Sequence, residues 1–326
     1  MKHQDRRSFL KVAGMSLGAG ALFKVMPLFG TEGTHELLGY LEENNGEGIT
    51  PFTFVQLSDA HVGFEGPNGT KAFERAVDMI NALPSPPDLV LFTGDLTHDT
   101  DDKDTHVARM KRFQQIAGGI RSARLVCVPG EHDAGEDGGA LFREFFGATN
   151  YSFDHRGMHF IALDNVSRAK PEVGSEQLSW LASDLTRFPK STPIVVFTHR
   201  PLFDLKPEWE WFTSDGDAVT NLLAPYENVT VLYGHIHRDN EHVQGHAQHY
   251  AARSLIFAFP DPTETNTKKP IPFDKDRPFK NLGIRLVREK AGAASVHSIA
   301  IEDVELSLRE FSGTNGIQQM LKGVNL

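Results

Sequence analysis

The sequence predicts an α/β fold, and three observations support this prediction. From residue 51 onward, short apolar runs of strand-like composition alternate with segments of helical spacing. The apolar runs are continuous, which is typical of strands covered by other layers on both faces. The chain of 326 residues is 40% apolar and 23% charged, values that are ordinary for a globular protein and allow one large domain or two smaller ones.

The predicted elements follow one another along the chain. Strands are predicted at FTFVQLSD (52–59), DLVLFTGD (88–95), RLVCVPG (124–130), HFIALDN (159–165), PIVVFTHR (193–200) and VTVLYGHIHR (229–238). Helices are predicted over residues 71–83, 103–120 and 175–188. Strand-like segments at 254–262, 281–289 and 294–302 have no helices between them, so we expect the sheet system to end with an antiparallel portion. The Pro- and Lys-rich segment 261–281 is interpreted as a long surface loop.

The first thirty residues resemble an export signal. Paired Arg6 and Arg7 precede an apolar run at residues 12–23 that has the length of a signal-peptide apolar region and is short for a membrane span. The pattern resembles a twin-arginine signal, which implies the twin-arginine export machinery as a partner and a periplasmic or exported location. An uncleaved anchor is the alternative, because Lys24 interrupts the segment and no clean A-x-A site follows. We favour the signal and expect no permanent membrane anchor.

Domain boundaries follow from these patterns. We assign residues 1–30 to the signal, 31–50 to a Gly-, Glu- and Asn-rich linker, 51–305 to the folded domain and 306–326 to a C-terminal tail. The formal net charge of −10 and the lack of a Lys/Arg-rich run argue against nucleic acid as a partner. The single cysteine, Cys127, excludes an intrachain disulfide and lies in an apolar run, so we interpret it as a buried hydrophobe.

Residues that bind metals follow most of the predicted strands. In open α/β sheets, ligands bind at the carboxyl ends of strands, so side chains distant in the sequence converge there. A lone histidine at such a place would usually be packed or solvated. So many histidines and carboxylates at strand ends instead predict a metal site. They are Asp59, His61, Asp95, Glu131, His132, Asp133, His199, His235 and His237.

The series D-A-H (59–61), G-D (94–95), G-E-H-D (130–133), T-H (198–199) and G-H-I-H (234–237) resembles the calcineurin-like metallophosphoesterase family. The resemblance covers residues 52–240 and implies a four-layer αββα sandwich of two mixed β-sheets flanked by helices, with two metal ions. It implies that Asp59, His61 and His237 hold one ion, that Glu131, His199 and His235 hold the other, and that Asp95 bridges them. It also implies that His132 lies just outside the metals and is oriented by Asp133.

Glu131 departs from the family pattern, which has an asparagine at this position. A carboxylate adds a full negative charge where an amide is neutral. Together with Asp59 and Asp95 it predicts three carboxylates around the ions, which favours iron or manganese over zinc. The same charge weakens the pull of the metals on water and on phosphate, so we expect metal preference or activity to differ from the common pattern.

The paired metals predict hydrolysis of a phosphate ester. Two such ions lower the pKa of a shared water, so that a metal-bound hydroxide attacks phosphorus, and they clamp the oxygens of an in-line displacement. His132 is the predicted general acid for the leaving group, with Asp133 raising its basicity. Alternatively, His132 and Asp133 only support Glu131.

Substrate contacts are less clearly indicated by the sequence. His98 and Arg200 are candidates to contact a phosphate oxygen, with surface or packing roles as the alternative. The aromatic residues of the segment 207–217 suggest a rim for a base or a lipid chain, although buried packing is favoured. His246 and His249 follow the last motif and are candidate pocket residues, with a satisfied or exposed histidine as the default.

These features predict an exported, dinuclear metal-dependent phosphoesterase that acts on a small-molecule phosphomonoester or phosphodiester. The first alternative is an enzyme like the cyclic-nucleotide phosphodiesterases, which the D-x-H and G-D-L-T-H motifs resemble; the predicted location argues against it. The second is a metal-binding protein that has lost hydrolysis, with Glu131 as its mark. Turnover of an aryl phosphate would distinguish an enzyme from this second alternative.

Overall fold

The computed structural model describes residues 52–289, except 84, 122 and 136, together with residues 299–306. The predicted signal and linker lie outside the described residues, as does nearly all of the predicted C-terminal tail. Within the described ranges, no helix combines the length and apolar character that crossing a membrane requires.

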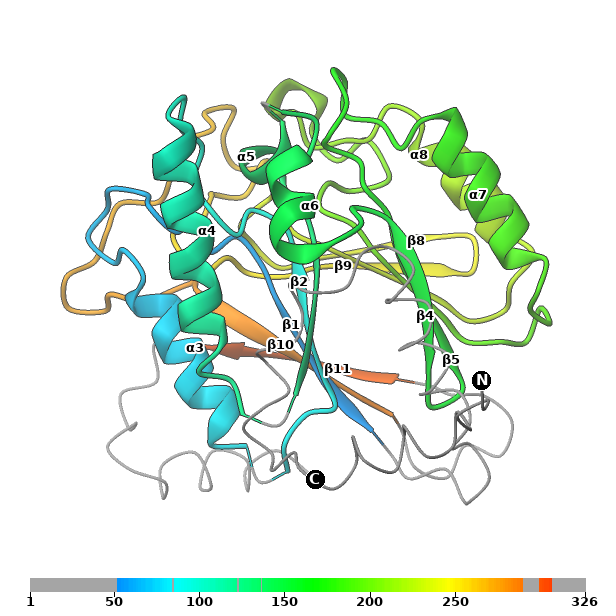
Figure 1. Cartoon of the computed structure of the whole chain (residues 1–326), viewed down its shortest axis with the longest axis horizontal. Helices are drawn as coiled ribbons and strands as arrows, with labels where there is room; N and C mark the ends of the chain where they lie inside the picture. The colour runs from blue at the N-terminus through cyan, green and yellow to red at the C-terminus, as the bar shows by residue number, and fades with distance from the viewer. Residues whose placement is uncertain (1–51, 84, 122, 136, 290–298, 307–326) are drawn as a thin grey trace, which may run out of the picture.

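Two mixed β-sheets form the centre of the molecule (Figure 1). The first sheet has the strand order β11-β10-β1-β2-β3, in which β1, β2 and β3 are parallel. Its strands are β1 (Thr53–Leu57), β2 (Leu89–Thr93), β3 (Arg124–Val128), β10 (Gly283–Glu289) and β11 (Ile299–Glu305). The antiparallel β10 and β11 confirm that the sheet system ends with an antiparallel portion.

The second sheet has the order β4-β5-β6-β7-β9-β8, with β5, β6, β7 and β9 parallel and β4 and β8 antiparallel at its edges. Its strands are β4 (Tyr151–His155), β5 (Met158–Ala162), β6 (Ile194–Phe197), β7 (Val229–Tyr233), β8 (Asn240–Gln244) and β9 (Ala247–Ala251). In both sheets the parallel strands therefore deliver their carboxyl ends to a common edge.

Helices lie outside both sheets, with α3 and α4 on one side and α7 and α8 on the other (Figure 1). The helices are α3 (Lys71–Asn81), α4 (Lys103–Ala117), α5 (Glu131–Ala134), α6 (Ala140–Phe146), α7 (Ser175–Leu185), η3 (Pro207–Trp209) and α8 (Gly216–Leu223). Asp102 caps α4, because its carboxylate accepts a bond of 2.8 Å from the backbone N–H of Thr105.

Successive side chains along the strands point alternately toward the other sheet and toward the helices, so each sheet is covered on both faces. In β1, Phe54 faces the second sheet while Val55 packs beneath α3 and α4. In β6, Val195 faces the first sheet while Val196 packs beneath α7 and α8. Both faces of each sheet are buried, which explains the continuous apolar runs in the sequence. The predicted four-layer αββα sandwich is confirmed.

Several elements differ from the prediction. Residues 254–262 were expected to form a strand but are irregular, because their backbone bonds to the loops that carry metal-binding residues. Leu255 N–H donates to the carbonyl of Asp59 at 3.1 Å, and the carbonyl of Phe257 accepts from His237 Nδ1 at 2.9 Å. The β8–β9 hairpin, β4, α6 and α8 were not predicted, since their short segments lack a clear apolar period. Cys127 is buried, as expected.

Candidate metal centre

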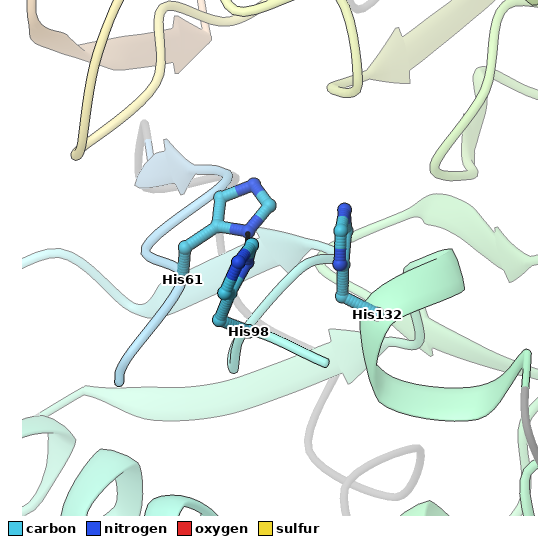
Figure 2. A group of neighbouring side chains, drawn as sticks. All are labelled: His61, His98 and His132. Carbon is cyan, nitrogen blue, oxygen red and sulfur yellow. Dashed lines mark hydrogen bonds between the residues drawn. The ribbon is translucent and has the colours of Figure 1, made fainter. Parts of the chain in front are cut away.

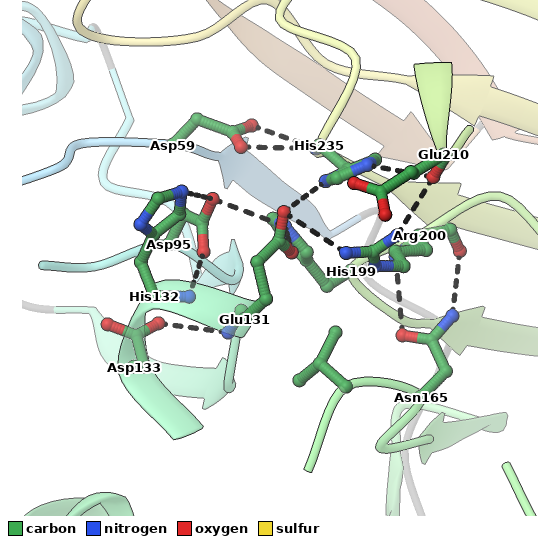
Figure 3. Close-up of polar contacts among 12 residues, drawn as sticks. Asp59, Asp95, Glu131, His132, Asp133, Asn165, His199, Arg200, Glu210 and His235 are labelled. Atoms are coloured by element: carbon green, nitrogen blue, oxygen red, sulfur yellow. Dashed lines mark hydrogen bonds and ion pairs between the residues drawn. The ribbon is translucent and has the colours of Figure 1, made fainter. Parts of the chain in front are cut away.

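The loops that follow β1, β2, β3, β6 and β7 bring all seven predicted metal ligands together. Figure 3 shows Asp59, Asp95, Glu131, His199 and His235 among them. They form two groups, within each of which the ligand atoms lie within 4.8 Å of one another. One group contains Asp59, His61, Asp95 and His237, and the other contains Asp95, Glu131, His199 and His235. The two groups are those that the sequence predicted for the two ions.

Asp95 belongs to both groups, as expected of a bridging ligand. Its Oδ2 lies 3.3 Å from His61 Nε2 and 3.4 Å from His199 Nε2. The other carboxylate oxygen accepts the backbone N–H of His132 at 3.1 Å, which fixes the orientation of the group. One oxygen thus faces both histidines while the second is held by the backbone.

The backbone at the site is strained. Asp59, His61, Asp95, His235 and His237 all have left-handed conformations, with φ between 42° and 65°. Non-glycine residues rarely adopt this region, and such residues cluster at functional sites, where the surrounding structure enforces them. This geometry is independent of the motifs and also indicates a functional centre at these loops.

Glycines precede three ligands because the loops approach one another closely. A Cβ on Gly130 would lie 2.0 Å from Asp95 Oδ1, and a Cβ on Gly234 would lie 1.9 Å from Ser58 Oγ. Any side chain at these positions would displace a ligand or the strand beside it. The Gly-Asp, Gly-Glu and Gly-His pairs of the sequence are therefore consequences of packing at the site.

Each of the four predicted histidine ligands has one ring nitrogen held by a neighbour, and its other nitrogen faces the ligand group. His199 Nδ1 donates to the carbonyl of Thr93 at 2.7 Å, and His237 Nδ1 donates to that of Phe257 at 2.9 Å. For His235 the partner is the carbonyl of Glu210, at 3.1 Å from Nε2. His61 Nδ1 lies 3.3 Å from a ring nitrogen of His98. Such outer bonds orient histidines that ligate metals.

Glu131 contributes both of its oxygens to the second group. Its Oε1 lies 2.8 Å from His235 Nδ1, and its Oε2 lies 2.8 Å from His199 Nε2. Burial alone would raise the pKa of Glu131, but His235, His199 and Arg200 hold it well below its ordinary value. The carboxylate is therefore ionised, as a ligand must be.

The donor set fits metal ions. Glu131 Oε2 and His199 Nε2 are shielded from solvent and have no hydrogen-bond partner among the described residues, although they lie close together. In the first group, His61 Nε2 and His237 Nε2 likewise approach to 3.1 Å. Converging nitrogen lone pairs and three carboxylates constitute a buried, electron-rich pair of sites, which a cation would stabilise. Imidazole and carboxylate donors suit iron, manganese and zinc.

His61 of the first group meets His98 and His132, which come from two other segments of the chain (Figure 2). The rings of His98 and His132 are stacked with centroids 4.9 Å apart, and the ring of His61 lies 4.7 Å from that of His132. The side chains of His98 and His132 are 30% and 26% exposed, whereas that of His61 is only 3% exposed. The exposed part of the centre therefore includes His98 and His132, together with Glu131, whose side chain is 25% exposed.

The structure places Asp99, and not Asp133, beside the ring of His132. Asp99 Oδ1 lies 2.7 Å from His132 Nδ1. The carboxylate of Asp133 instead accepts backbone N–H groups of Leu96, Thr97 and Gly130, at 2.8 to 3.0 Å, because the helical turn of α5 points it into the β2–α4 loop. The prediction that Asp133 orients the His132 ring is wrong in this respect: Asp133 holds the two loops together.

The predicted phosphate contacts are also engaged within the protein. His98 lies between His61 and Asp99, whose Oδ1 is 3.5 Å from His98 Nε2. Arg200 lies 3.4 Å from Glu131 Oε1 and donates to the carbonyl of Glu210 at 2.9 Å. Its side chain is only 10% exposed. Both residues thus support ligands of the centre, and Arg200 offsets part of the charge that Glu131 introduces.

Carboxylates set the charge state of His132. Burial lowers the pKa of its ring, but Asp95, Glu131 and Asp99 outweigh this effect and raise the pKa to about 9. Cations bound beside those carboxylates would reduce this rise. Burial and the nearby Asp95 raise the pKa of Asp133 to about 6, against the bonds it accepts from the backbone.

The tryptophans of the segment 207–217 and His249, which the sequence offered as candidate pocket residues, are buried in the protein interior. Trp209 and Trp211 are 3% and 0% exposed and pack with Tyr233 and Ile236, which confirms the packing interpretation. His249 is buried in β9 against Phe203, and burial lowers its pKa to about 4.

Sequence reasoning missed Asp99, although its place one residue after His98 in the G-D-L-T-H-D run was a usable signal. The carbonyls of Thr93, Glu210 and Phe257 had no sequence signal.

Comparison with known proteins agrees with this geometry. A sequence model described as calcineurin-like phosphoesterase matches residues 52–239. A protein of Arcobacter nitrofigilis named "Probable glycerophosphodiester phosphodiesterase GpdQ" is 28% identical over 201 residues, which cover 56% of this chain and 71% of that protein. The 3',5'-cyclic adenosine monophosphate phosphodiesterase CpdA of Escherichia coli K12 is 25% identical over 209 residues, covering 57% and 69% of the two chains.

A solved structure of a dimetal phosphatase from Danio rerio shares the fold, with a TM-score of 0.54 at 15% identity. The match covers 78% of this chain and 98% of that chain. The family match extends over more than half of the sequence and contains all seven residues of the two groups. The chain therefore belongs to the calcineurin-like phosphoesterase family and is a metal-dependent phosphoric ester hydrolase.

Proposed function

We propose that the chain is an exported dinuclear phosphoesterase that cleaves a small phosphodiester or phosphomonoester, with His132 as the general acid. The observation that carries this proposal is the position of His132, whose Nε2 lies 3.9 Å from Asp95 Oδ2, the oxygen that the two ligand groups share. A proton donor at this place lies beside any phosphate that reaches the centre. We favour diesters, because two of the similar proteins reported above are named as a probable and an actual phosphodiesterase.

The seven ligand residues divide the tasks at the centre. Asp59, His61 and His237 would hold one ion, Glu131, His199 and His235 the other, and Asp95 both. Two ions held in this way supply Lewis-acid stabilisation of the phosphate oxygens and activation of water. The remaining work belongs to the protein: His132 donates a proton from its ring to the leaving oxygen, and Asp99 holds the opposite nitrogen of that ring.

We propose iron or manganese as the metals. Three carboxylates surround the sites, and oxygen donors favour harder ions over zinc. Arg200 reduces the effect of the third carboxylate, because its guanidinium contacts Glu131 Oε1 at 3.4 Å. The preference therefore depends on how fully this ion pair offsets the charge of Glu131.

The first experiment is metal analysis of the purified protein combined with hydrolysis of 4-nitrophenyl phosphate and bis(4-nitrophenyl) phosphate. We expect two metals per chain, faster turnover of the diester, and loss of turnover in His132→Ala with unchanged metal content. Absence of turnover after reloading with manganese, iron and zinc would contradict the proposal. That result would favour a metal-binding protein without hydrolysis. Restoration of turnover in Glu131→Asn would support this rival function.

A second candidate function is hydrolysis of cyclic nucleotides, which the similarity to the E. coli enzyme CpdA favours. Assay of 3',5'-cyclic AMP beside the aryl diester tests it directly. Turnover of cyclic AMP well above that of the aryl diester would favour this candidate.

We also propose export through the twin-arginine pathway, on the basis of Arg6, Arg7 and the apolar run that follows them. Fractionation of bacterial cells that express the full chain tests this location. We expect the protein in the periplasmic fraction, and retention in the cytoplasm when both arginines are replaced by lysine. The proposal would be contradicted if the wild-type chain and the double-lysine variant were distributed in the same way between cytoplasm and periplasm.

A further inference from the structure

Two phenylalanine rings pack against histidines of the first ligand group, and a third ring, that of Phe64, packs against one of them and against His98. Phe64 follows His61 in the loop after β1, and Phe257 and Phe259 belong to the irregular segment after β9. The ring of Phe257 lies 4.5 Å from that of His237 and 6.0 Å from that of His61, and the ring of Phe259 lies 5.1 Å from that of His237. We name Phe64, Phe257 and Phe259 the aromatic cluster.

The aromatic cluster is continuous and only partly covered by protein. Phe64 and Phe257 have ring centroids 5.2 Å apart, and Phe257 and Phe259 have centroids 5.4 Å apart. All three side chains are half-buried, in contrast to the fully buried Trp211 nearby. The three residues therefore keep part of their surface in contact with water, and exposed apolar surface is unfavourable unless another apolar group covers it.

The aromatic cluster borders the exposed part of the centre. Phe64 meets His98 edge to face, with centroids 5.1 Å apart and an interplanar angle of 89°. His98 in turn stacks on His132, the proposed proton donor. A substrate that approaches the two ligand groups past His98 and His132 would therefore place one of its substituents beside Phe64 and Phe257.

We propose that the aromatic cluster is the subsite for a flat, apolar ring carried by the ester, as in an aryl or nucleoside ester. This inference rests on the proposed phosphoesterase function and names the substrate class. The rings of Phe64 and Phe257 are tilted by 53°, and those of Phe257 and Phe259 meet edge to face at 82°. Aromatic rings prefer such arrangements with one another, so the cluster favours a further ring over an alkyl chain. The subsite takes the group that stays on the phosphate after the leaving group has departed.

Matched diesters test the proposal on the metal-replete full chain. Methyl, hexyl and phenyl 4-nitrophenyl phosphate share one leaving group and differ in the retained group, so their kcat/KM values are compared after division by the uncatalysed rates. We expect the phenyl ester to exceed the methyl ester by about three- to ten-fold, the range that aromatic contacts provide, and to exceed the hexyl ester as well.

Variants of Phe64 isolate the cluster without touching a predicted ligand. In Phe64→Ala we expect kcat/KM for the phenyl ester to fall several-fold more than kcat/KM for the methyl ester, mainly through KM. Phe64→Leu keeps an apolar side chain of similar bulk and should lose preference for phenyl over hexyl only. The matched control is Phe273→Ala, because Phe273 is 46% exposed and takes part in none of the ring contacts described above.

Two results would overturn the inference. One is an unchanged phenyl-to-methyl ratio in Phe64→Ala, or an equal change in Phe273→Ala. The other is a hexyl ester as good as the phenyl ester in the wild type, which would assign the cluster to an alkyl chain. If no ester is hydrolysed, the proposed function fails separately. Binding of phenylphosphonate and methylphosphonate, measured by calorimetry in the wild type and Phe64→Ala, then decides: equal affinities would refute the subsite.

Discussion

The exchange of Asp99 for asparagine tests whether His132 delivers a proton to the leaving group. Asparagine keeps the size of the side chain and an acceptor oxygen but removes the negative charge that holds His132 Nδ1 at 2.7 Å. We expect the His132 ring to be held less firmly, so that its Nε2 is less well placed to give a proton to the leaving oxygen. The loss should therefore depend on how much the leaving group needs a proton.

The magnitude follows from the geometry. A hydrogen bond to a charged group contributes about 1.5 to 3 kcal/mol, and solvent screening lowers this value for exposed partners. The side chain of Asp99 is 51% exposed, whereas that of His132 is 26% exposed. We therefore expect about 1 to 2 kcal/mol, which corresponds to a loss of about 5- to 30-fold in kcat.

The assay compares two esters with different leaving groups. Methyl 4-nitrophenyl phosphate releases a weakly basic phenolate that needs little protonation, and methyl phenyl phosphate releases a more basic one. A general acid assists the more basic leaving group more strongly. We expect the full loss in Asp99→Asn with methyl phenyl phosphate and a clearly smaller loss with the nitrophenyl ester.

Controls separate this effect from metal loss. Asp99 also contacts His98, which contacts His61, so metal content must be measured on each sample. Asp101→Asn, in the same loop, is the matched control and should leave both rates unchanged. Equal losses for both esters in Asp99→Asn, at full metal content, would refute the role of His132 as general acid.

Three further predictions concern the site and the fold. In Gly234→Ala the new Cβ would lie 1.9 Å from Ser58 Oγ and 2.8 Å from Asp59 Oδ2, so we expect loss of bound metal by elemental analysis and a destabilisation of about 1 to 3 kcal/mol. Gly245→Ala, where no atom lies within 4 Å of the new Cβ, should keep its metal. Removal of the metals with a chelator should lower the midpoint of thermal unfolding by about 6 °C, since a ligand at a hundred times its Kd stabilises by about 2.7 kcal/mol. An unchanged midpoint would indicate that the ions bind weakly. The third is His159→Phe. His159 is fully buried and lies 2.6 Å from carboxylate oxygens of both Asp154 and Asp184, so the exchange should cost about 3 kcal/mol in urea denaturation near pH 6.

The His159 prediction has a defined pH window. Burial lowers the pKa of His159, but its bonds to Asp154 and Asp184 outweigh burial and raise the pKa above 6.5. Its stabilising contribution is therefore complete below about pH 6.5 and is lost as the pH rises through the folded value. Burial raises the pKa of Asp184, but His159 and Arg187 outweigh burial and lower this pKa below 3.8. The stabilising contribution of the Asp184 carboxylate is therefore lost only as the pH falls through its folded pKa. The difference between wild type and variant should shrink at pH 9.5, and a constant difference would refute this assignment.

Much of the centre could be predicted from the sequence because strand ends determine which residues meet. The apolar runs locate the parallel strands, and residues after such strands converge at one edge of a sheet. Asp59, Asp95 and His199 could be brought together on this ground before any contact was known. The segment 254–262 shows the limit, since its apolar run reads as a strand although its backbone bonds to the loops of Asp59 and His237.

The sequence by itself determined the fold class through its periodicity and the family through the order of its motifs, and the resemblance to that family predicted the two ligand groups. Only the tertiary structure decided that Asp99 partners His132, that Asp133 braces the loops, and that Arg200 offsets the charge of Glu131. The aromatic cluster likewise depends on contacts between segments almost 200 residues apart in the chain. The physical reason is that side-chain direction in a loop follows from backbone angles such as the left-handed φ values of the ligands, and packing between distant loops sets those angles.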